Sequence, residues 1–259
     1  MNHFVDTHAH LYLLEHATAD EAIARAKAQG VTTLISVSTE EGNWAKNRDY
    51  ALANDNLFYS VGLHPHDATK WPEVAPKLDA WFAKGVPPKC VGVGEMGLDY
   101  YYDKAPRDAQ MAALEGQFAV ARRTNLPVIL HCRESFDDLF GAIRRVGLAP
   151  KRPGIMHCFT GGPDEARKAL DLGLWISFSG ILTFKNAENI RQAAKIVPAD
   201  RILLETDCPF LAPIPNRGKP NEPSYLPHTA LVLAQARGET LERVAELTTA
   251  NAKAVFQLP

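Results

Sequence analysis

Short runs of β-branched and apolar residues alternate with longer stretches of helical composition along the chain. Such runs, bounded by turn-forming residues, are typical of buried strands. They predict strands at residues 3–8, 32–37, 57–63, 89–94, 126–131, 154–158, 174–178 and 201–206. The stretches between them predict helices, chiefly at residues 18–29, 40–54, 106–124, 135–146, 162–172 and 186–196, and residues 226–256 predict one or two more.

Eight strands that alternate with helices in 259 residues predict an α/β fold, a closed (β/α)8 TIM barrel. A doubly wound open sheet is the alternative, but no G-x-G-x-x-G turn follows the first strand. We expect residues 1–259 to form a single domain. Residues 208–225 are rich in proline and glycine and predict a long loop after the eighth strand.

Composition excludes several classes of protein. No stretch approaches the roughly 20 apolar residues of a membrane span, and the N-terminus lacks the pattern of a secretion signal. The four cysteines form no C-x-x-C pair, which indicates reduced thiols and a cytoplasmic protein. The formal charge of −2 provides no general attraction for nucleic acid, so any affinity for phosphate must come from local groups.

Metal-ligand residue types stand at the ends of several predicted strands. His8 and His10 are two residues apart at the end of the first strand, so their side chains point the same way. The other strand ends carry His64 and His66, Glu95, His131, His157, and Glu205 with Asp207. In a barrel these ends share one mouth, where such enzymes place their chemistry. Imidazoles and carboxylates gathered there predict a site for divalent metal.

Five runs of the sequence carry a family resemblance. They are FVDTHAHL at residues 4–11, GEMGLDY at 94–100, PVILHCR at 127–133, LETDCP at 204–209 and NRGKPNEP at 216–223. Together they closely resemble the TatD family of metal-dependent deoxyribonucleases, in the family's order and from about residue 3 to Phe256. Tyr12 is a departure, because the family usually has Asp or Asn after His-Leu.

The resemblance implies an amidohydrolase-like barrel that binds one or two divalent ions. His8 and His10 would bind the first ion with Asp207, and His131 and His157 the second, while Glu95 would bridge the pair. Asp207 would also act as the base that orients the attacking water. Four imidazoles favour zinc, manganese or iron, whereas the family points to magnesium or manganese.

The implied substrate is DNA, as single strands or strand ends, and the implied reaction is phosphodiester hydrolysis. The candidates for substrate contact are His64, Arg133, Arg217 and Lys219. The guanidinium of Arg133 can donate two parallel hydrogen bonds to a phosphate. Asp6 and Glu205 precede ligands by two residues, which predicts that they hydrogen-bond the ligands from the layer below. For Asp6, a purely structural network of buried carboxylates is an equal alternative.

Two other functions fit parts of the pattern. The same barrel could hydrolyse esters or amides, for example by removing a misattached aminoacyl group from transfer RNA. A non-catalytic, metal-dependent binding protein is the other alternative, and the complete ligand set with a candidate base argues against it. The sequence indicates no obligate protein partner.

Overall fold

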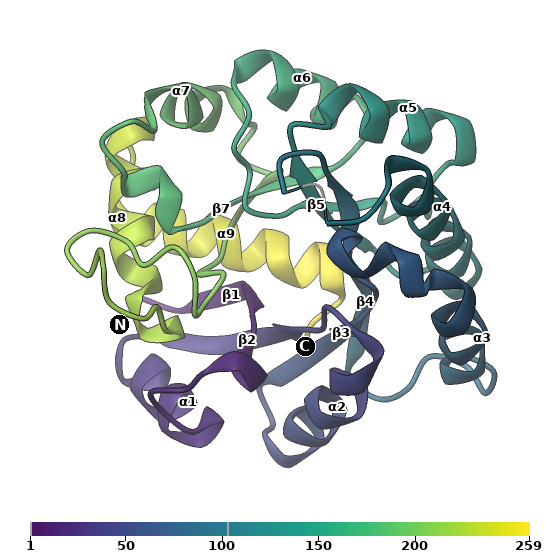
Figure 1. The fold of residues 1–259 in the computed structure, drawn as a ribbon. Helices are drawn as coiled ribbons and strands as arrows, with labels where there is room; N and C mark the ends of the chain where they lie inside the picture. Colours follow the sequence, from purple (N-terminus) through teal and green to yellow (C-terminus); the bar gives the residue numbers. More distant parts are fainter. Residues whose placement is uncertain (1, 103) are drawn as a thin grey trace.

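The computed structural model describes residues 2–102 and 104–259, and it contains eight parallel strands paired in chain order (Figure 1). The strands are β1 (Phe4–Ala9), β2 (Val31–Val37), β3 (Leu57–Val61), β4 (Cys90–Asp99), β5 (Val128–Arg133), β6 (Gly154–Met156), β7 (Trp175–Phe178) and β8 (Ile202–Leu204). The backbone N–H of Asp207 donates to the carbonyl of His8 at 2.9 Å, and that of His10 donates to Cys208 at 2.8 Å. These bonds join the ends of β1 and β8, so the sheet forms a nearly closed barrel and the predicted fold is confirmed.

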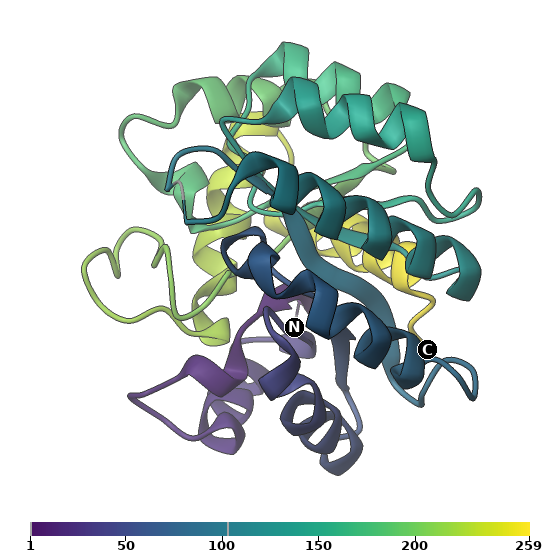
Figure 2. The ribbon, with the colours of Figure 1, turned by 45° about the vertical axis from the view of Figure 1, so that its right-hand side comes forward.

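Helices surround the strands on the outside of the barrel, and the last helix lies across one end of it (Figures 1 and 2). They are α1 (Ala19–Ala28), α2 (Trp44–Ala53), α3 (Trp71–Trp81), α4 (Arg107–Thr124), α5 (Phe136–Val146), α6 (Pro163–Asp171), α7 (Glu188–Ile196), α8 (Leu226–Arg237) and α9 (Leu241–Phe256). Local signals explain their ends: Thr18 and Glu21 form a capping box that starts α1, and Asn125 adopts the left-handed conformation that ends α4. None of the described helices is both long and apolar enough to cross a membrane.

Most of the buried apolar side chains in the described residues belong to two clusters. The larger one fills the space between the strands and the outer helices. The smaller one joins Val5, Ile129 and Leu203 of the strands with Val255 and Phe256 of α9. In Figure 1 this helix crosses behind the strands, so it covers one end of the barrel. The site lies at the other end.

The helix α3 and the strand β4 differ most from the sequence prediction, and the other strands differ by one or two residues at their ends. The helix α3 was not predicted, because Pro72 and Pro76 fall within it. Pro72 lies in the first turn, where a backbone N–H has no partner in the helix. Strand β4 continues five residues past the predicted end at residue 94. Glu95 therefore lies inside β4, and Asp99 is the last residue of the strand.

Candidate metal centre

The carboxyl ends of the strands surround a cavity of about 1040 Å³. Side chains from six strands or strand ends meet in its floor. Those of ligand type that line it include His10, His64, Glu95, His131, His157 and Asp207. The position at this end of the barrel matches the expectation drawn from the strand-end pattern.

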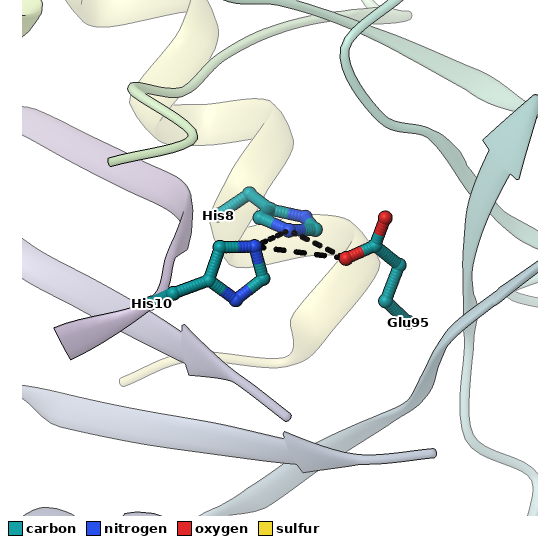
Figure 3. A group of neighbouring side chains, drawn as sticks. All are labelled: His8, His10 and Glu95. Carbon is teal, nitrogen blue, oxygen red and sulfur yellow. Dashed lines mark hydrogen bonds and ion pairs between the residues drawn. The ribbon is translucent and has the colours of Figure 1, made fainter. Parts of the chain in front are cut away.

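One group of ligand atoms gathers around the end of β1 (Figure 3). The Nε2 atoms of His8 and His10 lie 3.2 Å apart, and Oε2 of Glu95 lies 3.3 Å and 3.6 Å from them respectively. Asp207 completes the group, with Oδ1 at 3.3 Å from Nε2 of His10 and 3.7 Å from Nε2 of His8. Two imidazoles and two carboxylates thus present ligand atoms to one small space.

A second group gathers around the other oxygen of Glu95. Its Oε1 atom lies 2.9 Å from Nε2 of His157, 3.1 Å from Nδ1 of His131 and 3.4 Å from Nε2 of His64. The two oxygens of one carboxylate therefore face two separate groups of imidazoles. A carboxylate that bridges a pair of cations needs this arrangement.

Oxygen atoms lie behind two of the imidazole rings, on the side away from the ligand atoms. Nδ1–H of His10 donates to the backbone carbonyl of Val37 at 2.9 Å, which leaves Nε2 toward the first group. Nδ1 of His157 lies 3.3 Å from Oε1 of Glu205, a fully buried carboxylate. This contact is not the predicted hydrogen bond, because Nδ1 of His157 has no hydrogen-bond partner in the described residues, and Oε1 of Glu205 accepts the backbone N–H of Cys158 at 2.5 Å.

Asp6 makes a different set of bonds. Its carboxylate accepts the backbone N–H of His8 at 3.2 Å and both the backbone N–H and the hydroxyl of Thr206, at 3.0 Å and 2.6 Å. Burial raises the pKa of Asp6 to about 7, although the bonds from Thr206 oppose that rise. Asp6 thus ties β1 to the segment after β8 through the backbone and Thr206.

The electrostatics of the centre suit a divalent cation. Burial alone would raise the pKa of Glu95, but His157, His64 and His131 outweigh burial and hold that pKa well below its usual range. Among residues 2–102 and 104–259, neither Glu95 nor Asp207 forms an ion pair with Lys or Arg. Buried charge of this kind needs compensation.

Unpartnered nitrogen atoms point to the same conclusion. Both ring nitrogens of His157 and Nδ1 of His8 are buried without a hydrogen-bond partner in the described chain. The short contact between Nε2 of His157 and Glu95 lacks hydrogen-bond geometry, although its length is 2.9 Å. A nitrogen lone pair beside a carboxylate oxygen is a donor set that fits a metal ion.

The candidates for substrate contact divide into two pairs. His64 and Arg133 line the cavity, and the Arg133 guanidinium lies 4.0 Å and 4.5 Å from the ring centres of Tyr101 and Tyr102. Arg217 and Lys219, on the loop after β8, are not among the lining residues. The Arg217 guanidinium instead lies 4.0 Å over the ring of Phe184.

The sequence analysis did not single out Asp99 as a site residue. Its carboxylate lies in the same cavity and contacts His66 and His131. Alternation along a strand places residues 95, 97 and 99 on one face, so a longer β4 would have predicted it. Tyr12, the departure from the family pattern, donates or accepts a 2.8 Å hydrogen bond with the hydroxyl of Thr39.

Comparisons with known proteins agree with this geometry. The family model described as TatD related DNase matches residues 5–257. An uncharacterized metal-dependent hydrolase of Bacillus subtilis, YabD, is 40% identical over 255 residues, which cover 98% of each chain. The 3'-5' ssDNA/RNA exonuclease TatD of Klebsiella pneumoniae is 34% identical over 244 residues, covering 92% of this chain and 91% of that protein.

A solved structure shows that the similarity to known proteins includes the fold. The crystal structure of YjjV, a TatD homolog from Escherichia coli K12, superposes with a TM-score of 0.92 at 32% identity. It covers 99% of this chain, and the match covers 98% of YjjV. The chain therefore belongs to the TatD related DNase family and is a metal-dependent hydrolase of that family.

Proposed function

We propose that this hydrolase cleaves phosphodiester bonds in DNA and removes nucleotides from the ends of single strands. The observation that carries the proposal is the position of Glu95, whose two oxygens face separate groups of imidazoles. Such a centre suits in-line displacement at phosphorus, in which the attacking and leaving oxygens both need stabilisation. The substrate class follows from the relatives named as 3'-5' ssDNA/RNA exonucleases.

The residues of the centre divide into ligands for two divalent ions. His8, His10 and Asp207 would hold one, His131 and His157 the other, and Glu95 would contact both. Magnesium, manganese and zinc are the candidates, because carboxylates suit the first two and imidazoles suit zinc. When bound, the ions supply a Lewis acid that makes water a better nucleophile near neutral pH and offsets charge on the phosphate.

Asp207 is the proposed base. Its carboxylate lines the cavity and is 8% exposed, so a water molecule and a substrate can reach it. Oδ1 lies 3.3 Å from Nε2 of His10, which fixes the carboxylate beside the first group. From there it accepts the proton of the attacking water.

Substrate phosphate would meet Arg133 and His64 on the cavity wall. The rings of Tyr101 and Tyr102 lie against the Arg133 guanidinium, whose N–H donors are suited to two phosphate oxygens. Contacts from Arg217 and Lys219 would require the loop after β8 to bend over the cavity. The free cysteines in the described residues are consistent with a reducing compartment, and we infer that the enzyme acts in the cytoplasm.

The experiment that tests the proposal offers two substrates to protein purified without chelator. Single-stranded DNA labelled at one end and a misacylated transfer RNA are supplied at equal concentration with Mg²⁺, Mn²⁺ or Zn²⁺. We expect stepwise shortening of the DNA, and loss of that activity in Asp207→Asn with at least one ion still bound. Fast ester release without DNA cleavage would reject the nuclease in favour of a deacylase.

A further inference from the structure

The carboxylate of Asp99 accepts four hydrogen bonds at the edge of the metal centre. Its Oδ2 atom accepts from Nε2 of His66 at 2.9 Å and from Nε2 of His131 at 3.1 Å. Its Oδ1 atom accepts from the backbone N–H groups of Tyr101 and Tyr102, at 3.0 Å and 3.1 Å. The carboxylate has no exposed surface, so these bonds are made without competition from bulk water.

The backbone of Asp99 is fixed as firmly as its side chain. The buried amide of Gln110, on α4, accepts the N–H of Asp99 at 2.8 Å and donates to its carbonyl at 3.1 Å. Both backbone groups of the last residue in β4 are thus held by one side chain. The carboxylate consequently has a defined position relative to β5, the strand that carries His131.

Each ring nitrogen of His131 faces a carboxylate at 3.1 Å: Nε2 faces Asp99 and Nδ1 faces Glu95. An imidazole binds a metal ion through the nitrogen that carries no hydrogen. Oε1 of Glu95 also lies 2.9 Å from Nε2 of His157, so an ion shared by these three residues would lie on the Nδ1 side of His131. Nδ1 would then be the ligand, and Nε2 would donate its hydrogen to the carboxylate of Asp99. His10 is arranged the other way, with Nδ1 bonded to Val37 and Nε2 toward the centre.

We propose that Asp99 is a positioning residue that makes His131 bind the second ion through Nδ1 and also fixes the wall that carries Arg133. The inference rests on the metal centre of the proposed function. The second role follows from Oδ1, which holds the backbone of Tyr101 and Tyr102, whose rings lie against the Arg133 guanidinium. One carboxylate thereby joins a metal ligand to a substrate contact.

Asp99→Asn tests this role with little change in shape. The amide oxygen can still accept from Tyr101 and Tyr102, but the amide NH2 then faces Nε2 of His131. That nitrogen must become an acceptor, which moves the proton to Nδ1 and blocks it as a ligand. We expect one Mn²⁺ to bind as in the wild type and the affinity for the second to fall about 10- to 100-fold.

The measurement is equilibrium dialysis of metal-free protein against Mn²⁺, with no substrate present. Asp67→Asn is the matched control, because Asp67 pairs with Lys70 near His66 and contacts no imidazole in the described residues. It should bind two ions as the wild type does. A folded Asp99→Asn that binds both ions with wild-type affinity would overturn the proposal.

A spectroscopic measurement on the wild type covers the case in which Asp99→Asn does not fold. Long-range ¹H–¹⁵N spectra of the Zn²⁺-loaded protein, with His131 assigned from His131→Gln, should show a protonated Nε2 and a metal-bound Nδ1. Coordination through Nε2 would overturn the inference. Because neither readout uses DNA, a protein that binds metal in this way but cleaves no DNA would contradict only the proposed function.

Discussion

Oε1 of Glu205 lies 3.3 Å from Nδ1 of His157, and both side chains are almost completely buried. The carboxylate approaches the imidazole from the side opposite Glu95, whose Oε1 lies 2.9 Å from Nε2 of the same ring. The contact between Glu205 and His157 lacks hydrogen-bond geometry, so Glu205 acts on His157 through its negative charge, which raises the basicity of the ring as a ligand. The centre therefore has a supporting layer beneath the ligand atoms.

Replacing Glu205 by Gln tests whether its carboxylate supports His157 as a metal ligand. The amide has a similar shape but no charge, so it should hold His157 less firmly. We expect the affinity for one ion, or the rate of hydrolysis, to fall about 10- to 100-fold. Metal titration and turnover of Asp6→Asn provide the comparison, because Asp6 bonds to Thr206 and the backbone of His8 but to no imidazole in the described chain. Equal losses in both variants would contradict a specific role for Glu205.

Replacing Glu95 by Gln tests whether its carboxylate bridges two ions, one beside His8 and His10 and the other beside His131 and His157. Gln keeps the size of the side chain but removes the charge that would hold two cations together. We predict loss of the second ion and a fall in rate of about a hundredfold or more, given the scale of metal assistance. Metal analysis and rate measurements on the same preparation check this. Full metal content with unchanged turnover would show that Glu95 does not bridge.

Much of the fold was accessible from the sequence because its signals are local. Apolar runs predicted the eight strands, and the residues at their ends predicted one polar mouth. The helix α3 escaped prediction because its two prolines are unfavourable by local propensity. Buried Val74 and Leu78 on that helix show the tertiary packing that favours it nonetheless.

The sequence predicted which ligand-type residues gather at one end of the barrel, but not how they lie relative to one another. Which oxygen of Glu95 faces which imidazole depends on how closely β4 approaches β5. Gly97 permits that approach, since a Cβ there would overlap the carbonyl group of His131. Asp99 was missed because its role depends on β4 continuing past residue 94. The place of Arg217 over Phe184 could not be read from an irregular loop, which has no periodicity.

Glu222, in the segment after β8, should stabilise the folded protein by an amount that depends on pH. Its carboxylate accepts hydrogen bonds from Arg25 on α1, including one of 2.6 Å. Burial alone would raise the pKa of Glu222, but the bonds from Arg25 and Ser224 outweigh burial and lower the pKa below its ordinary value of 4.5. A lowered folded-state pKa stabilises the folded protein above the unfolded-state pKa, and that contribution is lost as pH falls through the folded-state value.

We therefore expect Glu222→Gln to lower the free energy of unfolding by about 1–2 kcal/mol at pH 7, given the partial exposure of Arg25. The difference from wild type should shrink below about pH 4.5, where the unfolded carboxyl is protonated. Urea denaturation followed by circular dichroism at several pH values measures it. Glu15→Gln, at an exposed carboxylate, is the control. If the difference in the free energy of unfolding between wild type and Glu222→Gln grew toward low pH, the stabilisation by the Glu222 carboxylate would be rejected.

The affinity of the enzyme for single-stranded DNA should depend only weakly on salt concentration, because few cationic side chains can contact the DNA. Among the described residues that line the cavity, Lys104 and Arg133 are the permanent cations, and the chain has a formal charge of −2. We predict contact with about two or three phosphates near a terminus. The slope of log affinity against log salt for single-stranded DNA should then be about −1.5 to −2. Binding of a labelled oligonucleotide to metal-loaded Asp207→Asn, measured across salt concentrations, provides the value.

A covalently closed circle of single-stranded DNA separates binding at an end from binding along the strand. Two or three phosphate contacts cannot follow a long backbone, so the enzyme should degrade a linear strand and leave the circle of the same sequence intact. A slope steeper than about −4 would mean six or more neutralised phosphates. Rapid cutting of the circle would show that no free end is needed. Either result would reject end binding, yet the assignment of Glu95, His131 and Asp207 to the metal centre would be unaffected, because metal titration tests it without DNA.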